Sequence, residues 1–213
     1  MARKKPSLNT SLLGDAFGGP AEKMIDLEKL RLDGGTQPRA ELDEQAIGEY
    51  AEVMCRMRDR KGNAIPHGKI VDRDNKPFPA ITVFHDGTNH WLADGFHRVA
   101  AAKKAGYTDI QADVHSGTQR DAIRHSVGVN ATHGKRRTNA DKRRAVQRLL
   151  RDEEWGQYTD TYIAKLCKVS RPFAAKVRKE LVSGGDIEAS TTRIDSAGNK
   201  IDVVESQNAA RKA

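Results

Sequence analysis

The sequence predicts an α+β protein, with a small mixed-sheet domain at residues 22–116 followed by an all-helical domain at residues 117–183. Short alternations of apolar and polar residues, typical of strands, dominate the first segment. In the second, apolar residues recur every three or four positions, which is the spacing of amphipathic helices. Residues 1–21 and 184–213 are mostly polar, so we expect a disordered arm and a polar tail with a hairpin around residues 196–199.

The bulk composition favours folded modules with polar ends. Of the 213 residues, 37% are hydrophobic and 31% are charged, which is too polar for one packed globule. No apolar run is long enough to span a bilayer, and Met1–Lys5 is not followed by the apolar segment of a signal peptide. Cys55 and Cys167 lie in predicted helices without metal-ligand spacing, so we expect buried thiols in a cytoplasmic protein.

The net charge of +8 is concentrated in the second half of the chain. Residues 118–182 hold 16 Lys or Arg and 7 Asp or Glu, whereas the rest of the chain is nearly neutral. Residues 135–151 alone hold eight basic residues and one acid. Neighbouring like charges on a helix repel each other, so a polyanionic partner is expected here, with a solvated charged face as the alternative.

The sheet domain is expected to alternate strands with two helices. In chain order, the pattern predicts a strand at 24–27, a helix at 44–58 capped by Asp43, a strand at 69–71, a hairpin of strands 80–84 and 90–92, a helix at 99–105 and a strand at 109–114. The turn Asp86-Gly87 joins the two strands of the hairpin, and Gly106 ends the second helix.

Asp94-Gly95 lies where a strand becomes a helix, and the functional site of the sheet domain is expected there. Glycine lets the backbone turn sharply and approach a ligand closely, and the free N–H groups of a helix start favour an anion. His97 and Arg98 lie in the first helical turn, where a guanidinium can hold a phosphate through two hydrogen bonds. These features allow a phosphate cradle, but spacing alone favours an ordinary strand–helix turn with two solvated polar residues, because short glycine motifs are common.

Two helices are expected to open the helical domain. One runs from residue 118 to about 133 and the other from 138 to about 155, and each begins with a Thr followed three residues later by an Asp. The linker between them is basic, as is the outward face of the second helix. The residues expected to hold DNA phosphates are Lys135, Arg136, Arg137 and Arg144.

Residues 160–182 have the pattern of a helix-turn-helix, whose second helix enters the major groove of DNA. Asp160 is expected to cap the first helix, Lys168 to adopt a left-handed conformation, and Ser170 to cap the second helix. The inward residues of the second helix are predicted to be Phe173, Ala174, Val177 and Leu181. The residues expected to contact DNA are Ser170, Arg171, Ala175, Lys176 and Arg178. An ordinary helical hairpin is the alternative.

Three short motifs resemble those of the ParB family of chromosome and plasmid partition proteins, and of the wider ParB/sulfiredoxin-like fold. They are Ile25-Asp26-Leu27 with Thr36-Gln37-Pro38-Arg39, Asp94-Gly95-Phe96-His97-Arg98, and Val129-Asn130-Ala131-Thr132. The resemblance implies a nucleotide site for CTP or ATP with Mg²⁺, and double-stranded DNA as the partner in partition or transcription regulation. The implied nucleotide-binding residues are Thr36, Gln37, Arg39, Gly95, His97, Arg98 and Asn130.

Two departures from the family pattern bear on this nucleotide site. Phe96-His97 replaces the family's central Glu-Arg, and Val129 replaces its metal-binding Glu, so that Asn130 alone remains as a metal ligand. The motif also resembles that of ParB-like free-serine kinases, in which the Asp is a catalytic base. This implies an alternative function, a nucleotide-dependent NTPase or small-molecule kinase that uses Asp94, His97 and Arg98.

A third interpretation gives the sheet domain a protein-binding role through an exposed Phe96. In sulfiredoxins this position holds the reactive Cys, so sulfiredoxin chemistry is not expected. The preferred interpretation is a cytoplasmic DNA-binding protein, associated with a nucleoid or a plasmid and responsive to a nucleotide. Helix-turn-helix proteins usually bind DNA as dimers, so a homodimer is expected, although the sequence shows no zipper heptads.

Overall fold

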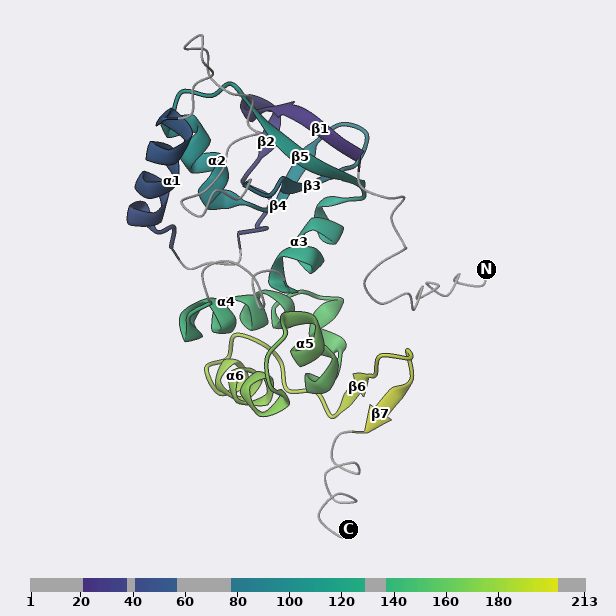
Figure 1. Ribbon diagram of the computed structural model, residues 1–213. Coiled ribbons are helices and arrows are strands. Elements are labelled where there is room, and N and C mark those ends of the chain that lie inside the picture. Colours follow the sequence, from purple (N-terminus) through teal and green to yellow (C-terminus); the bar gives the residue numbers. More distant parts are fainter. Residues whose placement is uncertain (1–20, 38–40, 57–77, 129–136, 203–213) are drawn as a thin grey trace. The chain divides into compact units, whose positions relative to one another are not determined.

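The computed structural model describes residues 21–37, 41–56, 78–128 and 137–202, and its chain divides into two compact units (Figure 1). Residues Phe17–Val129 form one, which we call the sheet unit, and Asn130–Ala213 belong to the other, which we call the helical unit. The predicted α+β class is confirmed, because the strands of the first unit are followed by the helices of the second.

A five-stranded mixed sheet with the order β1-β5-β3-β4-β2 is the centre of the sheet unit (Figure 1). β1 (Ala21–Asp26) and β5 (Asp109–Ser116) are antiparallel, and β3 (Ile81–His85) runs parallel to β5. β4 (His90–Asp94) pairs with β3 in the predicted antiparallel hairpin and runs parallel to the short edge strand β2 (Leu30–Arg31). A 3₁₀ turn, Leu27–Lys29, connects β1 to β2. The site predicted at Asp94-Gly95 therefore lies at the end of an interior strand.

Alternation along β3 and β4 directs successive side chains to opposite faces of the sheet. Val83 and Leu92 join the main core, which contains residues of both α1 (Glu44–Arg56) and α2 (Phe96–Lys104). Phe84 and Trp91 point to the other face and form a second cluster with Ala122 of α3. Helices therefore cover both faces of the sheet.

The first helix of the sheet unit begins as the sequence predicts. Oδ1 of Asp43 accepts hydrogen bonds from the backbone N–H groups of Gln45 (3.1 Å) and Ala46 (3.2 Å). Ile47 and Met54 of α1 are buried in the main core. The predicted end of this helix at residue 58 and the predicted strand at 69–71 lie outside the described residues.

α3 (Gln119–Gly128) belongs to the sheet unit, so the two compact units divide between residues 129 and 130 rather than at the predicted boundary of 116/117. Ala122 is fully buried in the cluster with Trp91, and Nε2 of Gln119 donates to the carbonyl oxygen of Gly34 (2.8 Å). Helical periodicity identifies the buried face of α3 but does not say which part of the fold that face covers.

The helical unit packs α4 (Asn139–Leu150), α5 (Asp160–Cys167) and α6 (Arg171–Ser183) against one another. The predicted start of α4 is confirmed, since the Thr138 hydroxyl accepts from Asp141 N and the Asp141 carboxylate accepts from Thr138 N. A short hairpin follows α6 where the sequence predicts one. Its strands are β6 (Thr192–Ile194) and β7 (Lys200–Asp202).

α4 ends at Leu150, five residues before its predicted end near Trp155. Oδ1 of Asp152 accepts hydrogen bonds from the backbone N–H groups of Glu154 (3.0 Å) and Trp155 (3.1 Å), and a 3₁₀ turn, Trp155–Gln157, follows. A Cβ on Gly156 would lie 2.7 Å from the carbonyl oxygen of Leu150. The chain therefore folds back closely on the end of α4, and Trp155 is buried in the 3₁₀ turn that follows.

Among the described helices, none is both long enough and apolar enough to cross a membrane.

Candidate functional site

The α5–α6 pair is built by its capping residues. Thr159 rather than Asp160 is the N-cap of α5, because its hydroxyl accepts from the backbone N–H of Tyr162 (3.4 Å). Lys168 has φ 49° and ψ 53°, so it adopts the predicted left-handed conformation between the helices. Ser170 caps α6 as predicted, and its Oγ accepts from Phe173 N (3.4 Å).

One face of α6 carries exposed basic side chains. Arg171 and Lys176 are exposed and Ala175 is half-buried, as the sequence predicts for a face that contacts DNA. The opposite face is formed by Ala174, Val177 and Leu181, which are all buried. Phe173 is only half-buried, because it lies at the edge of that apolar face.

α4 adds further basic residues to the helical unit. Arg144 is exposed as predicted, and so is Arg148, one helical turn further along. Arg143 is less free, because its guanidinium forms an ion pair with Glu180 of α6. Lys135 and Arg136 lie outside the described residues, so the predicted basic linker stays a prediction.

Arg178, which was expected to face DNA, is buried in the helical unit and only 6% exposed. Its Nε donates to Oδ1 of Asp160 (2.6 Å), while Nη1 and Nη2 donate to the carbonyl oxygens of Gly156 (2.7 Å) and Tyr158 (2.6 Å). Burial lowers the pKa of Arg178, whereas the nearby Asp160 raises it. The expectation that Arg178 contacts base edges is therefore wrong for this structure, in which it ties α6 to the start of α5.

Sequence reasoning also missed the second partner of Asp160. Nη1 of Arg193, at the centre of β6, donates to Oδ2 of Asp160 (2.6 Å). The hairpin is attached to the same place by the Thr159 N–H, which donates to the carbonyl oxygen of Ile194 (2.9 Å). The sequence did contain a signal for this role. Thr159 can cap the helix with its hydroxyl, which leaves the Asp160 carboxylate available to bind other side chains.

Arg137, the third predicted phosphate-binding residue of the linker, is buried as well, with an exposed fraction of 7%. Its Nη2 donates to the carbonyl oxygen of Cys167 (2.5 Å), the last residue of α5. A cation at a helix C-terminus is favoured by the helix dipole. Arg137 therefore caps α5 from within instead of presenting its charge to a phosphate.

The two cysteines are expected to differ sharply toward a thiol reagent, because only the thiolate reacts. Burial raises the pKa of the Cys167 thiol to about 12, whereas Cys55 is exposed, so the expectation of a buried thiol is wrong for Cys55. At pH 8 we expect one fast reaction with dithiobis(nitrobenzoate), which Cys55→Ser abolishes, and a second reaction only after unfolding in urea. The folded Cys55→Ser variant retains only Cys167, and the folded Cys167→Ser variant retains only Cys55. Fast labelling of the remaining thiol in both variants would contradict this arrangement.

The predicted strand–helix turn is present, and it requires glycine. Gly95 has φ +104°, and a Cβ there would lie 2.5 Å from Cγ2 of Ile81. Gly95 is the N-cap of α2, and no side chain caps that helix start. The backbone N–H groups of the first turn are thus arranged as an anion site would need them.

Gly95→Ala is expected to lower the free energy of unfolding by about 2–3 kcal/mol, through the positive φ and the clash with Ile81. Urea unfolding followed by circular dichroism measures this loss. Gly87→Ala is a matched control, since Gly87 also has a positive φ (+98°) but a Cβ there would touch nothing within 4 Å. Equal losses in both variants would show that the clash contributes nothing.

Arg98 is enclosed by the fold instead of facing a ligand. Its Nη2 donates to Oδ2 of Asp94 (2.9 Å), and its Nη1 donates to the carbonyl oxygens of Pro79 and Ala80. Burial lowers the pKa of Arg98, whereas Asp94 raises it. The guanidinium and the carboxylate that the motif offered as phosphate ligand and catalytic base are thus bound to each other.

His97 also has a structural partner, because its Nε2 accepts from the backbone N–H of Asp43 (3.0 Å). Thr36 is fully buried and its Oγ1 has no hydrogen-bond partner, while Gln37 is half-buried. Arg39 and Asn130, the remaining predicted nucleotide ligands, lie outside the described residues.

The fit of these residues to a magnesium nucleotide is partial. The uncapped start of α2 and the unpaired Thr36 hydroxyl fit a phosphate and a polar ligand group. The enclosed Arg98 does not fit the predicted phosphate fork. Within the described ranges, no three His, Cys, Asp or Glu side chains are grouped as a metal site would require.

Comparison with known proteins gives two curated relatives, and no family model matches the chain. The "Transcriptional regulator NovG" of Streptomyces niveus is 25% identical over 125 residues, which cover 59% of this chain and 38% of the relative. The "Streptomycin biosynthesis operon possible regulatory protein" of Streptomyces griseus is 26% identical over 153 residues, covering 71% and 42%. The chain thus spans about two fifths of the length of these relatives.

Solved structures are similar as well, including the following three. Sulfiredoxin from Arabidopsis thaliana covers 50% of this chain and 97% of its own, with 20% identity and a TM-score of 0.32. ParB from Caulobacter crescentus complexed with CTP-γ-S covers 79% and 88%, with 16% identity and a TM-score of 0.36. The same protein bound to the centromeric parS site covers 78% and 79%, with 14% identity and a TM-score of 0.45. These structures carry the names of the two groups, ParB and sulfiredoxin, whose motifs the sequence resembles.

Proposed function

We propose that this chain is a ParB-like DNA-binding protein that acts in partition or in transcription regulation. The observation that carries the proposal is the exposed basic start of α6, which presents Arg171 and Lys176. A left-handed turn at Lys168 and the cap at Ser170 place this helix directly after α5. This arrangement supports the proposal of a helix-turn-helix, a motif whose second helix inserts into the major groove.

Within this proposal the exposed side chains divide into two roles. Arg171 and Lys176 reach base edges, where Arg and Lys pair with the O6 and N7 acceptors of guanine. Arg144 and Arg148 of α4 bind phosphates and supply affinity that does not depend on sequence. The Ser170 hydroxyl accepts a bond within α6, so its own hydrogen remains available to a phosphate.

The curated relatives favour the regulatory role over the partition role, since their names describe a transcriptional regulator and a possible regulatory protein. A helix-turn-helix protein of this kind binds as a homodimer to an inverted repeat, with half-sites one helical turn apart or a multiple of it. Sites of this form are therefore the expected outcome of an unbiased selection.

The function is tested by selecting genomic fragments with the purified protein at fixed physiological salt, with and without CTP or ATP. We expect enrichment of one inverted repeat, and a nucleotide effect on that enrichment if the α2 start and Thr36 form a nucleotide site. If no fragment is enriched over the others, a sequence-specific DNA-binding role is contradicted. The alternative enzymatic function is tested by the rate of CTP or ATP hydrolysis. An equal rate in Asp94→Asn would exclude Asp94 as a catalytic base.

Lys176→Ala is expected to weaken binding to the selected site about tenfold or more, because one base contact is worth about 1–3 kcal/mol. Arg148→Ala should instead weaken binding to all sequences and reduce the slope of log K against log salt by about 1. Fluorescence anisotropy with specific and scrambled duplexes measures both effects. Lys200→Ala, which removes an exposed Lys of β7, is the control expected to change neither quantity.

A further inference from the structure

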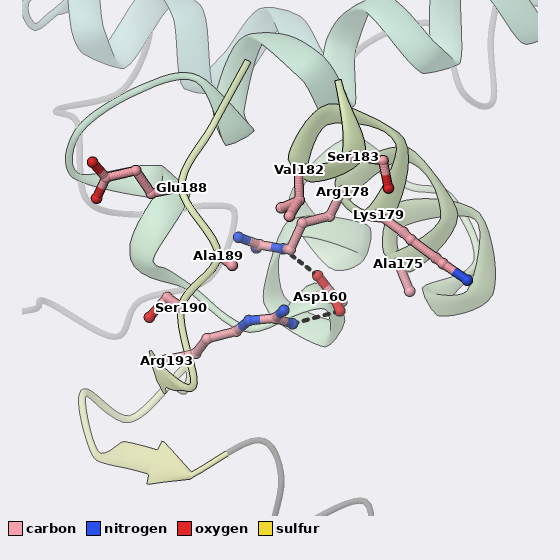
Figure 2. Close-up of a pocket in the computed structure, with 10 residues that line it drawn as sticks. All are labelled: Asp160, Ala175, Arg178, Lys179, Val182, Ser183, Glu188, Ala189, Ser190 and Arg193. Atoms are coloured by element: carbon pink, nitrogen blue, oxygen red, sulfur yellow. Dashed lines mark hydrogen bonds and ion pairs between the residues drawn. The ribbon is translucent and has the colours of Figure 1, made fainter. Parts of the chain in front are cut away.

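A pocket of about 380 Å³ lies beside α6, between that helix and the chain that leads into β6 (Figure 2). Its volume is in the range of small-molecule sites. Ala175 lines it from the helix, and Ala189 and Ser190 line it from the opposite segment. Short side chains at these positions leave room for an occupant.

The charged groups around the pocket leave one positive charge in excess, since Arg178, Lys179 and Arg193 face Asp160 and Glu188. Figure 2 shows the two guanidinium groups directed at the one carboxylate of Asp160 from different elements. Arg178 binds its Oδ1 and Arg193 binds its Oδ2, both at 2.6 Å. The side chains of Arg178, Asp160 and Arg193 are only 8%, 13% and 16% exposed, so water screens the excess charge poorly.

Arg193 has a donor that the structure leaves unused. Its Nη1 is bound to Asp160, but its Nε is buried and has no hydrogen-bond partner. Buried donors in folded proteins are nearly always paired, which indicates that a partner is missing here. Nε and Nη2 form the edge of a guanidinium that binds a carboxylate or phosphate through two parallel hydrogen bonds.

We propose that this pocket binds a small molecule carrying a phosphate or carboxylate group, and that Arg193 holds the oxyanion. Lys179 lines the pocket from the same helix as the exposed Lys176. An anionic occupant therefore offsets positive charge next to the surface proposed for DNA and lowers the affinity for DNA. This regulatory consequence rests on the proposed function, whereas the binding site itself does not.

The test titrates the full chain with inorganic phosphate in place of chloride at constant ionic strength, and follows the arginine ¹Hε–¹⁵Nε signals by NMR. Arg193→Lys identifies the Arg193 signal and keeps the charge while removing the fork. We expect a saturable shift of this signal in the wild type. In Arg193→Lys, which lacks that signal, phosphate binding is followed through the Nε signal of Arg178, which also lines the pocket, and is expected to be about tenfold or more weaker. Arg151→Lys is the matched control expected to bind phosphate as the wild type does, because Arg151 pairs with Asp186 on the surface.

An Arg193 signal that does not move, or that shifts in proportion to phosphate without saturation, would overturn the proposal. A second titration uses a DNA duplex in chloride. A saturable shift caused by DNA and not by phosphate would assign the oxyanion to the DNA backbone and overturn the small-molecule site. A failure of DNA binding is detected separately, by the anisotropy of the labelled duplex. Such a failure would leave the result of the phosphate titration unchanged.

Discussion

Replacement of Arg178 by alanine is expected to lower the free energy of unfolding of the helical unit by about 3–5 kcal/mol. The substitution removes the donors that satisfy the Asp160 carboxylate and the carbonyl oxygens of Gly156 and Tyr158. Each of these bonds involves a charged group in a buried place, where a partner left unpaired is costly. Urea unfolding followed by circular dichroism at pH 7 measures the loss.

Lys176→Ala is the matched control for Arg178, because it removes a basic side chain from the exposed face of the same helix. Its effect on stability is expected to stay within about 0.5 kcal/mol, while its effect on DNA binding is large. Arg178→Ala should show the reverse when the variant is assayed under conditions in which it is folded. A stable Arg178→Ala variant that loses sequence preference would return Arg178 to the DNA-contacting residues.

Local signals in the sequence predicted the helical unit well. The Thr138 and Asp141 pair, the Ser170 cap and the left-handed Lys168 all depend on residues within four positions of each other. Such interactions are formed by the segment itself, so their residue types identify them. The buried face of α6 followed in the same way from the spacing of its apolar residues.

The roles of Arg178 and Arg137 could not be read from spacing. Arg178 precedes an exposed Lys on α6, and the long arginine side chain can reach either solvent or the chain beneath it. Its partners lie 18–22 residues earlier, at the turn into α5, and the Cys167 carbonyl oxygen bound by Arg137 lies 30 residues later. A basic residue in a basic segment indicates a surface charge by default, and only the tertiary fold shows which of them are buried.

In the sheet unit, the elements were predicted more successfully than their arrangement. Alternation located β3, β4 and β5, and the turn at Asp86-Gly87 predicted which two strands form the hairpin. The pairing of β1 with β5 joins residues that are 83 to 93 positions apart, such as Asp26 with Asp109 and Ala21 with Val114, which no local pattern specifies. For the same reason the sequence did not show that α3 covers the second face of the sheet.

Arg98→Ala is expected to lower the free energy of unfolding of the sheet unit by about 3–4 kcal/mol. The Arg98 and Asp94 side chains are 11% and 22% exposed, so removal of the guanidinium leaves a carboxylate in a largely buried place and two carbonyl oxygens without their donor. Lys103→Ala, at an exposed position of the same helix, is the matched control expected to remain within about 0.5 kcal/mol. Unfolding of both variants by urea measures the difference.

This measurement also decides between the two roles that the motif allows for Arg98. If Arg98 holds β4 and α2 to the chain before β3, its removal lowers the free energy of unfolding, whether or not a nucleotide is present. If Arg98 only binds the phosphates of a nucleotide, its removal would leave the stability of the free protein nearly unchanged. It would abolish only the stabilisation by CTP or ATP. We expect the first result, because the guanidinium already binds Asp94 and the carbonyl oxygens of Pro79 and Ala80.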